Sequence, residues 1–200
     1  MKTYSVSIKT VLNEPNEKEW EILCEDLPKK LVKKAVRFKN WRDKAIRLHG
    51  WKMLLRELKK INQTELMNTI KFEKKGKPFF DNSNIFFNMS NSKNTIILIT
   101  APYEVGVDLE FVRPVKRTIY SRVFCKEEIE FLGQSNNEEA DFIKLWTKKE
   151  AVVKLFGGGI SMGLANFSVL KNELFVFGRI VIIEKIDFME GSAHLAFFKH

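Results

Sequence analysis

Three carboxylates carry the strongest indication of chemistry in this chain. Asp108 and Glu110 lie two residues apart in the segment 105–111, where apolar side chains alternate with glycine and acids. Because this alternation has the period of a half-buried strand, both carboxylates leave the strand on the same face. A third carboxylate beside them, Glu150, would complete an all-oxygen site, which is the type that Mg²⁺ or Mn²⁺ prefers. The pattern therefore predicts a metal site at Asp108, Glu110 and Glu150.

Glu150 lies in a predicted helix over residues 138–156, which ends at Gly157. The helix is indicated by apolar residues at near-helical spacing: Phe142, Leu145, Trp146, Val152, Val153 and Leu155. On this helix Glu150 and Lys154 lie one turn apart. Acids on a strand and a Glu–Lys pair on a helix are each common on solvated surfaces, so only their combination favours a functional site. Zinc is not favoured, since the three histidines and two cysteines lack the short spacings of zinc ligands.

The composition fits a globular protein with a substantial core. The 200 residues are 44% hydrophobic, which allows one large domain or two halves of about 100 residues each. The first residues alternate like a strand and lack the apolar stretch of a signal peptide, and no segment resembles a membrane span. Two separated cysteines make no disulfide framework. We therefore expect a cytoplasmic protein that does not enter a membrane.

Positive charge is concentrated in the first half of the chain. Residues 1–100 contain 21 Lys and Arg against 11 Asp and Glu, whereas residues 101–200 contain 13 against 14. The excess lies mostly in residues 27–60, which hold 13 basic and 2 acidic side chains on two predicted helices. A basic helix face is often merely solvated, but this excess predicts an anionic partner: a nucleic acid, a nucleotide or an acidic protein.

The periodicity predicts strands and helices in a repeated order. The first half is expected to contain a strand at 4–11, two basic helices reaching about residue 61, and strands at 69–74, 84–89 and 94–100. The second half is expected to contain the strand at 105–111, helices at 116–123, 126–132 and 138–156, and strands at 166–170, 173–178, 180–186 and 193–199. The order predicts an α+β fold of two similar α/β lobes with pseudo-two-fold symmetry. Each lobe would be a small, mostly antiparallel sheet packed against helices, with residues 1–103 in one and 104–200 in the other. The functional site would then lie where the lobes meet.

Three ordered segments resemble the 4′-phosphopantetheinyl transferases, specifically the two-lobed, surfactin-synthetase-activating type. They are Val105–Glu110, Phe124–Glu128 and Leu145–Lys154. Weaker support comes from the basic turn Gly76–Pro78 and from the segment Phe87–Ser92. The resemblance covers most of the chain. It departs from the family at Asn91, where His is common, and at Cys125, where Ser or Thr is usual and is expected to cap a helix.

The resemblance implies a reaction and its participants. Enzymes of this family transfer the 4′-phosphopantetheine group of coenzyme A to a serine of an acyl or peptidyl carrier protein and release 3′,5′-ADP. Magnesium, with manganese as an alternative, would be held by Asp108, Glu110 and Glu150. Glu150 would accept the serine proton, directly or through a water on the metal, and Lys154 would stabilise or protonate the leaving oxygen.

The resemblance also implies a set of contacts to coenzyme A. Those to the nucleotide and its 3′-phosphate fall on Lys30, Lys33 and Arg47. The remaining contacts to coenzyme A fall on Lys75, Lys77, Ser90, Asn91, Asp108 and Lys154. Asn91 can donate a hydrogen bond to a phosphate but cannot become cationic as the family histidine can.

Two other functions share some of these features. A magnesium-dependent nuclease would also use carboxylates, a lysine and a basic surface, although such sites usually place the lysine two residues after the acid on a strand. A non-catalytic nucleic-acid-binding protein would explain the net charge of +9 but leaves the three carboxylates unexplained. We therefore expect no nucleic-acid partner. A monomer is predicted, because one two-lobed chain supplies both sides of the site.

Overall fold

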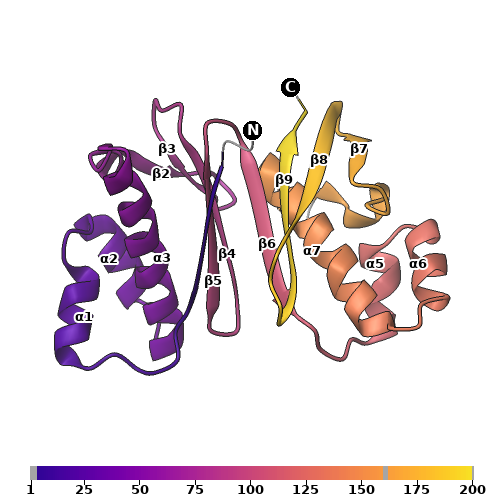
Figure 1. Cartoon of the computed structure of the whole chain (residues 1–200), viewed down its shortest axis with the longest axis horizontal. Coiled ribbons are helices and arrows are strands. Elements are labelled where there is room, and N and C mark those ends of the chain that lie inside the picture. The colour runs from indigo at the N-terminus through magenta and orange to yellow at the C-terminus, as the bar shows by residue number, and fades with distance from the viewer. Residues whose placement is uncertain (1–3, 160–161, 200) are drawn as a thin grey trace.

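The computed structural model describes residues 4–159 and 162–199, and it confirms the predicted α+β class. Figure 1 shows helices at both ends of the molecule and strands between them. Two antiparallel sheets stand side by side at the centre, and each has helices on its outer side. The pseudo-two-fold symmetry and the boundary between residues 103 and 104 stay predictions.

The strands form one small sheet for each half of the chain and a separate two-stranded ribbon. The first sheet has the order β1-β5-β4 and contains Ser5–Thr10, Thr95–Ala101 and Phe86–Ser92. The ribbon pairs β2 (Ile70–Phe72) with β3 (Pro78–Phe80). The other sheet has the order β6-β9-β8-β7 and contains Val105–Phe111, Gly191–Phe198, Arg179–Ile186 and Glu173–Val176. Every pairing is antiparallel, as expected.

The helices are divided between the two outer sides. The first half of the chain contains, between β1 and β2, the helices α1 (Glu17–Cys24), α2 (Lys29–Val36), α3 (Trp41–Lys60) and α4 (Leu66–Thr69). Those of the second half are the 3₁₀ turn η1 (Arg117–Ile119), α5 (Tyr120–Val123), α6 (Lys126–Gly133), α7 (Glu138–Phe156) and the 3₁₀ turn η3 (Leu164–Asn166). Asn16, Asn40 and Asn137 cap the N-termini of α1, α3 and α7 with their side-chain oxygens.

Three apolar clusters follow from this layering. One lies between α1–α3 and the first sheet, and another lies between α5–α7 and the second sheet. The third joins the two sheets face to face, with Ile97 and Ile99 of β5 against Val107 and Leu109 of β6. Ile96 and Leu98 of β5 belong to the first cluster, so alternate residues of β5 face opposite clusters, as strand geometry requires.

The predicted half-buried strand at 105–111 has the right bounds but the wrong environment. β6 is buried on both faces, because the first sheet covers its apolar side chains and α7 covers Gly106 and Asp108. Asp108 is thus buried inside the protein, and Glu110 is half-buried rather than on a solvated face.

Three further expectations need correction. Helix α1 was not predicted, although its capping box between Asn16 and Glu19 is visible in the sequence. Strand β3 was also missed, because three residues are too short to show a period. The predicted strand at 166–170 is wrong. Its residues form the end of η3 and an irregular segment whose backbone is bound by side chains instead of a neighbouring strand.

Within residues 4–159 and 162–199, no helix combines the length and the apolar character needed to cross a membrane.

Candidate functional site

Strand β6 and helix α7 place the predicted acids on facing surfaces. A Cβ atom at Gly106 would lie 2.1 Å from the carbonyl oxygen of Ala151 and 2.3 Å from the backbone nitrogen of Leu155, so α7 crosses β6 at this glycine. Asp108 and Glu110 project from the same face of β6 as Gly106. The close crossing therefore brings the face of α7 that carries Glu150 and Lys154 toward the two strand carboxylates.

Asp108 uses its two carboxylate oxygens differently. Its Oδ1 accepts hydrogen bonds from the Ser90 hydroxyl at 2.7 Å and from the Lys154 ammonium at 2.6 Å. The Lys154 ammonium also donates to the Ser90 hydroxyl oxygen at 2.6 Å, so the three side chains form a closed triangle. Asp108 Oδ2 is buried and has no hydrogen-bond partner among the described residues.

Glu150 has a similarly unsatisfied oxygen. Its Oε1 is buried without a hydrogen-bond partner in the described part of the chain. Burial raises the pKa of Glu150, and the negative charges of Asp108 and Glu110 raise it further, whereas the Lys154 ammonium opposes this shift. The three charged neighbours therefore have opposing effects on the pKa of Glu150.

Glu110 completes the set of predicted carboxylates but has a protein partner. Its Oε2 accepts a hydrogen bond from the Ser92 hydroxyl at 2.5 Å. Ser90 and Ser92 both come from β4, which runs beside β6, and each binds one of the two acids.

The three acids are near one another without forming a closed cage. Among residues 4–159 and 162–199, no group of three His, Cys, Asp or Glu side chains is arranged closely enough to hold a metal ion. The unpartnered oxygens of Asp108 and Glu150 nevertheless fit a hard cation, because a buried carboxylate oxygen needs a donor or a positive charge.

Two neighbouring cavities lie near this site, and Glu150 lines one of them. One, of about 300 Å³, is lined by Lys75, Lys77, Asn88, Glu150, Lys154 and the glycines Gly157 and Gly159, among others. The other, of about 160 Å³, is lined by Arg47, Trp51, Phe72, Ser90 and Asn91, among others. They share Gly76, Pro78 and Met89, so together they make one bent cavity with a charged and an aromatic end. A larger cavity of about 460 Å³ between β1 and the end of α3 contains none of the predicted site residues.

The cationic residues predicted to bind coenzyme A fall into two groups. Arg47, Lys75 and Lys77 line the bent cavity. Lys77 is partly buried, which lowers its pKa, and its ammonium donates to the Leu155 carbonyl at 2.9 Å. Lys30 and Lys33 lie on α2 and do not line either part of this cavity. The ammonium of Lys30 donates instead to the carbonyls of Asn68 and Ile70, at 2.8 and 2.7 Å.

Some residues of the site were not predicted. Asn88 lines the cavity and is buried, and its side-chain oxygen accepts a hydrogen bond from the Val107 backbone nitrogen at 2.9 Å. This bond ties β4 to β6, the edge strands of the two sheets. A polar amide in the otherwise apolar run 85–89 was the available signal for it. No sequence signal marked Trp51 and Phe72 as cavity residues, because aromatic residues of an apolar core and of a cavity wall look alike in a sequence.

Comparison with known proteins points to one family. A sequence model of the 4′-phosphopantetheinyl transferase superfamily matches residues 104–180. The chain is 37% identical over 89 residues to the 4′-phosphopantetheinyl transferase psf-1 of Bacillus pumilus, which is 44% of this chain and 38% of that protein. It is 35% identical over 97 residues to Sfp of Bacillus subtilis strain 168, covering 47% of this chain and 43% of Sfp. These matches thus span less than half the length of either relative.

A third relative is matched over a longer region. The 4′-phosphopantetheinyl transferase gsp of Aneurinibacillus migulanus is 28% identical over 169 residues, which is 82% of this chain and 70% of that protein. The family model spans β6, α7 and all three predicted carboxylates. The predicted resemblance is therefore confirmed: the chain is similar to 4′-phosphopantetheinyl transferases, and the superfamily model matches the part that contains the three carboxylates.

Proposed function

We propose that this protein transfers the 4′-phosphopantetheine group of coenzyme A to a serine hydroxyl of an acyl or peptidyl carrier protein. The observation that carries the proposal is the bent cavity between α7, β4 and the turn at residues 75–78. It combines the cations Lys75, Lys77 and Lys154 with the unsatisfied carboxylate oxygen of Glu150, beside that of Asp108. Cations and a carboxylate-bound metal are what phosphoryl transfer requires.

Coenzyme A would lie along the bent cavity. Lys75 and Lys77 would bind its diphosphate by charge-assisted hydrogen bonds, and Ser90 and Asn91 would add neutral donors. Arg47 belongs to the aromatic end, which suits the nucleotide. Lys30 and Lys33, which lie on α2 outside this cavity, are proposed contacts to the 3′-phosphate. To make that contact, the Lys30 ammonium must leave the carbonyls that it binds in this structure.

Asp108, Glu110 and Glu150 would hold Mg²⁺ or Mn²⁺. Asp108 and Glu150 each offer an oxygen that needs no existing bond to be broken, whereas Glu110 offers the carboxylate that Ser92 already contacts. When bound, the cation would offset the negative charge on the phosphoryl oxygens.

The bond changes can be assigned to two residues of α7. The serine oxygen of the carrier protein forms a bond to the phosphorus that carries pantetheine, and the bond from that phosphorus to the bridging oxygen breaks. Glu150 accepts the serine proton, and its raised pKa makes it a stronger base than an ordinary carboxylate. Lys154 stabilises the oxygen of the departing 3′,5′-ADP, to which it can move from Asp108 Oδ1.

The carrier protein would approach near η1 and α6. Of the apolar residues in that region, Ile119 and Phe131 are exposed, whereas Val123, Phe124 and Leu132 are buried in the core. The candidate docking edge is therefore smaller than the sequence pattern suggests. A monomer is proposed, since residues before and after position 104 already supply both sides of the cavity.

The direct test is the intact mass of an apo acyl carrier protein after incubation with this protein, coenzyme A and Mg²⁺. We expect a gain of one phosphopantetheine group, which is absent without metal and with Glu150→Ala. Glu173→Gln is a matched control, because Glu173 is an exposed acid paired with Lys199 outside the site. If several carriers gain no mass and calorimetry shows no binding of coenzyme A, the proposal is wrong.

A further inference from the structure

Two consecutive lysines of α7 point into the protein instead of into the cavity. Lys149 is completely buried beside Glu128, which is also completely buried, with 2.8 Å between the ammonium and the carboxylate. Lys148 is buried as well, and burial lowers its pKa to about 8. Burying three ionisable groups costs free energy unless each is paired or hydrogen-bonded. The groups that their side chains contact therefore determine whether this cost is offset.

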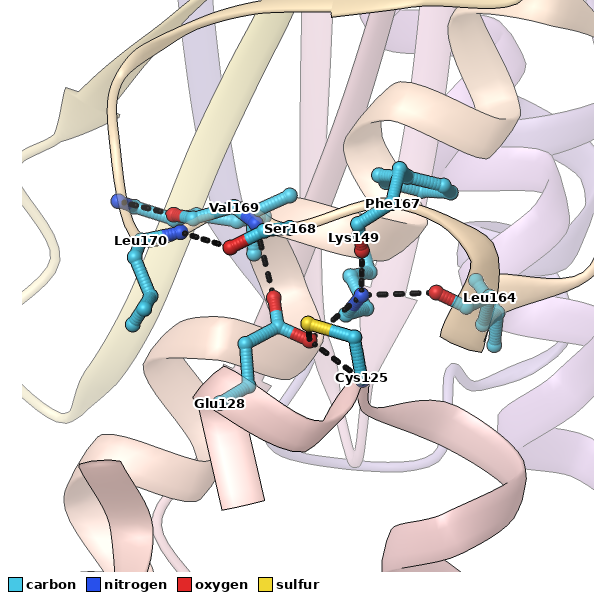
Figure 2. Close-up of polar contacts among 9 residues, drawn as sticks. Cys125, Glu128, Lys149, Leu164, Phe167, Ser168, Val169 and Leu170 are labelled. Atoms are coloured by element: carbon cyan, nitrogen blue, oxygen red, sulfur yellow. Dashed lines mark hydrogen bonds and ion pairs between the residues drawn. The ribbon is translucent and has the colours of Figure 1, made fainter. Parts of the chain in front are cut away.

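The contacts of these residues converge on one irregular segment. Figure 2 shows the Lys149 ammonium reaching the carbonyl oxygens of Leu164 and Phe167, at 2.7 and 2.5 Å, in addition to Glu128. The other carboxylate oxygen of Glu128 accepts a hydrogen bond from the Val169 backbone nitrogen at 2.8 Å.

Two more contacts extend this network at its ends. The Lys148 ammonium donates to the Val169 carbonyl at 2.9 Å. Cys125, at the N-cap position of α6, donates to Glu128 through its backbone nitrogen at 3.0 Å, which fixes the carboxylate from the other side. Side chains of α6 and α7 therefore supply hydrogen bonds that a neighbouring strand would otherwise provide for residues 164–169.

This bound segment continues from the wall of the cavity. Helix α7 ends at Phe156, Gly157 takes a left-handed conformation, and Gly157 and Gly159 line the cavity. The face of α7 toward β9 is held separately, since the Thr147 hydroxyl contacts His194 Nδ1 at 2.8 Å. The lysine contacts and the Thr147 contact thus hold different parts of the structure: the former bind residues 164–169, and the latter joins α7 to β9.

We propose that Lys149 and Glu128, assisted by Lys148, are positioning residues that hold the glycine wall of the coenzyme A cavity. This inference rests on the proposed function. Neither residue lines the cavity, and their effect would reach its wall through the backbone nitrogen of Met162, which donates to the Gly159 carbonyl at 3.1 Å. Loss of the network would loosen the wall and weaken the binding of coenzyme A, while Glu150 and Lys154 stay in place on α7.

The test compares four variants: Lys149→Met, Glu128→Gln, the two combined, and Thr147→Val as the matched control. Lys149→Met alone leaves the Glu128 charge buried and unpaired. Its effect therefore combines a loss of folding stability with the loss of the contacts to the Leu164 and Phe167 carbonyls. The double variant contains no unpaired charge but still lacks a donor for the Leu164 and Phe167 carbonyls. Thr147→Val removes a buried hydrogen bond of α7 without touching those carbonyls.

For the double variant we expect thermal stability closer to wild type than that of Lys149→Met. Its Kd and KM for coenzyme A are expected to rise about 10-fold with little change in kcat, the scale on which supporting contacts usually act. Amide exchange should accelerate in residues 162–169 and not in α7. Thr147→Val should lower stability and leave the Kd for coenzyme A unchanged.

Several outcomes would overturn the inference. A wild-type Kd for coenzyme A in the double variant, or the same rise in Kd for Thr147→Val, would show that the buried pair only stabilises the fold. If the double variant does not fold, Lys148→Met decides, since it removes only the contact to Val169; an unchanged Kd would refute the role. The failure of the proposed function is recognised separately, because the wild-type protein would then neither bind coenzyme A nor modify a carrier.

Discussion

Asp108 shows how one carboxylate can serve two cations. Its Oδ1 accepts hydrogen bonds from Lys154 and Ser90, whereas its Oδ2 is buried and has no hydrogen-bond partner among the residues that the structure describes. A cation that approaches Oδ2 therefore displaces no hydrogen bond from a described residue. Glu110 differs, because a cation there must share the carboxylate with the Ser92 hydroxyl. The two strand acids are thus expected to contribute unequally.

We predict that Asp108→Asn lowers the rate of carrier modification by about 10²- to 10³-fold, and that Glu110→Gln lowers it by less. The physical reason is that Asp108 contacts both Lys154 and the candidate metal position. The measurement is the rate of holo-carrier formation over a series of Mg²⁺ concentrations, with Glu173→Gln as the surface control. An unchanged rate in Asp108→Asn would contradict a role of this carboxylate in the reaction. No carrier modification by either protein, together with tighter binding of a polyanion by Asp108→Asn, would favour the non-catalytic binding protein.

His194 gives a prediction about pH that is independent of turnover. It is buried, and burial together with the nearby Lys148, Lys144 and Lys185 lowers its pKa from 6.5 to about 3. Below pH 6.5 the unfolded chain therefore binds a proton at His194 that the folded protein does not bind. The free energy of unfolding falls as pH falls through this window, by up to ~1.4 kcal/mol per pH unit, and the full contribution is present above pH 6.5.

We predict that His194→Asn reduces this pH dependence, because asparagine has no proton to gain and can still bind Thr147. Urea unfolding of both proteins between pH 8 and pH 4 measures the difference. The stabilities of the two proteins should converge as pH falls. Parallel curves over the whole range would mean that His194 is protonated to the same extent in the folded and unfolded states.

The individual site residues were partly predictable. Asp108, Glu110, Glu150 and Lys154 follow from the local period and motif, and the structure places all four around one crossing. The pairing of Lys154 with Asp108 and the contact of Asn88 with Val107 could not be predicted, since both join segments far apart in the sequence.

At the scale of elements, the distance between α7 and β6 decides whether the site can form. Gly106 allows this close crossing, because any Cβ there would meet the backbone atoms Ala151 O and Leu155 N. Backbone atoms of a helix cannot move separately, so the whole of α7 would have to shift. The carboxylates of the strand would then lie farther from Glu150.

We predict that Gly106→Ala lowers the free energy of unfolding by about 1–3 kcal/mol, as expected for overpacking, and reduces carrier modification strongly. Gly133→Ala is the matched control, since a Cβ at this helical position meets nothing within 4 Å. It should be neutral or slightly stabilising, because alanine favours helix more than glycine does. Equal effects of the two substitutions in thermal unfolding and in turnover would contradict the close-crossing argument.

The helices and strands were predicted correctly where a periodic pattern of apolar residues extends over many positions. The prediction failed where the structure depends on contacts between segments far apart in the sequence. The bounds of β6 and α7 were predicted correctly, because their apolar residues alternate or recur over several turns. The segment 166–170 was predicted as a strand because its apolar side chains at Phe167 and Val169 alternate with polar ones. Its backbone is bound by Lys148, Lys149 and Glu128, and no local pattern reveals such contacts.

At the scale of the whole molecule, charge is the property that most separates the two halves of the chain. The segment 29–47 carries nine basic side chains, and none of them forms an ion pair with any described residue. Unpaired cations on α2 and at the start of α3 repel one another, which costs stability unless a partner supplies negative charge. Coenzyme A phosphates and an acidic carrier are the partners that the proposed function supplies.

We predict that kcat/KM for carrier modification falls as salt rises from about 0.05 M to about 0.5 M, because exposed charges are screened over this range. Lys33→Glu should lower kcat/KM at low salt and reduce its salt dependence. Lys33 is exposed on α2 and makes no ion pair with any of residues 4–159 and 162–199, so no such pair would be lost. Lys171→Glu changes the same charge at an exposed position outside the basic helices and is the control.

If both charge reversals lower kcat/KM equally, the net charge of the molecule controls the rate of association. If only Lys33→Glu does so, the position of the cations on α2 is what matters, and a parallel rise in the Kd for coenzyme A would separate nucleotide binding from steering of the carrier.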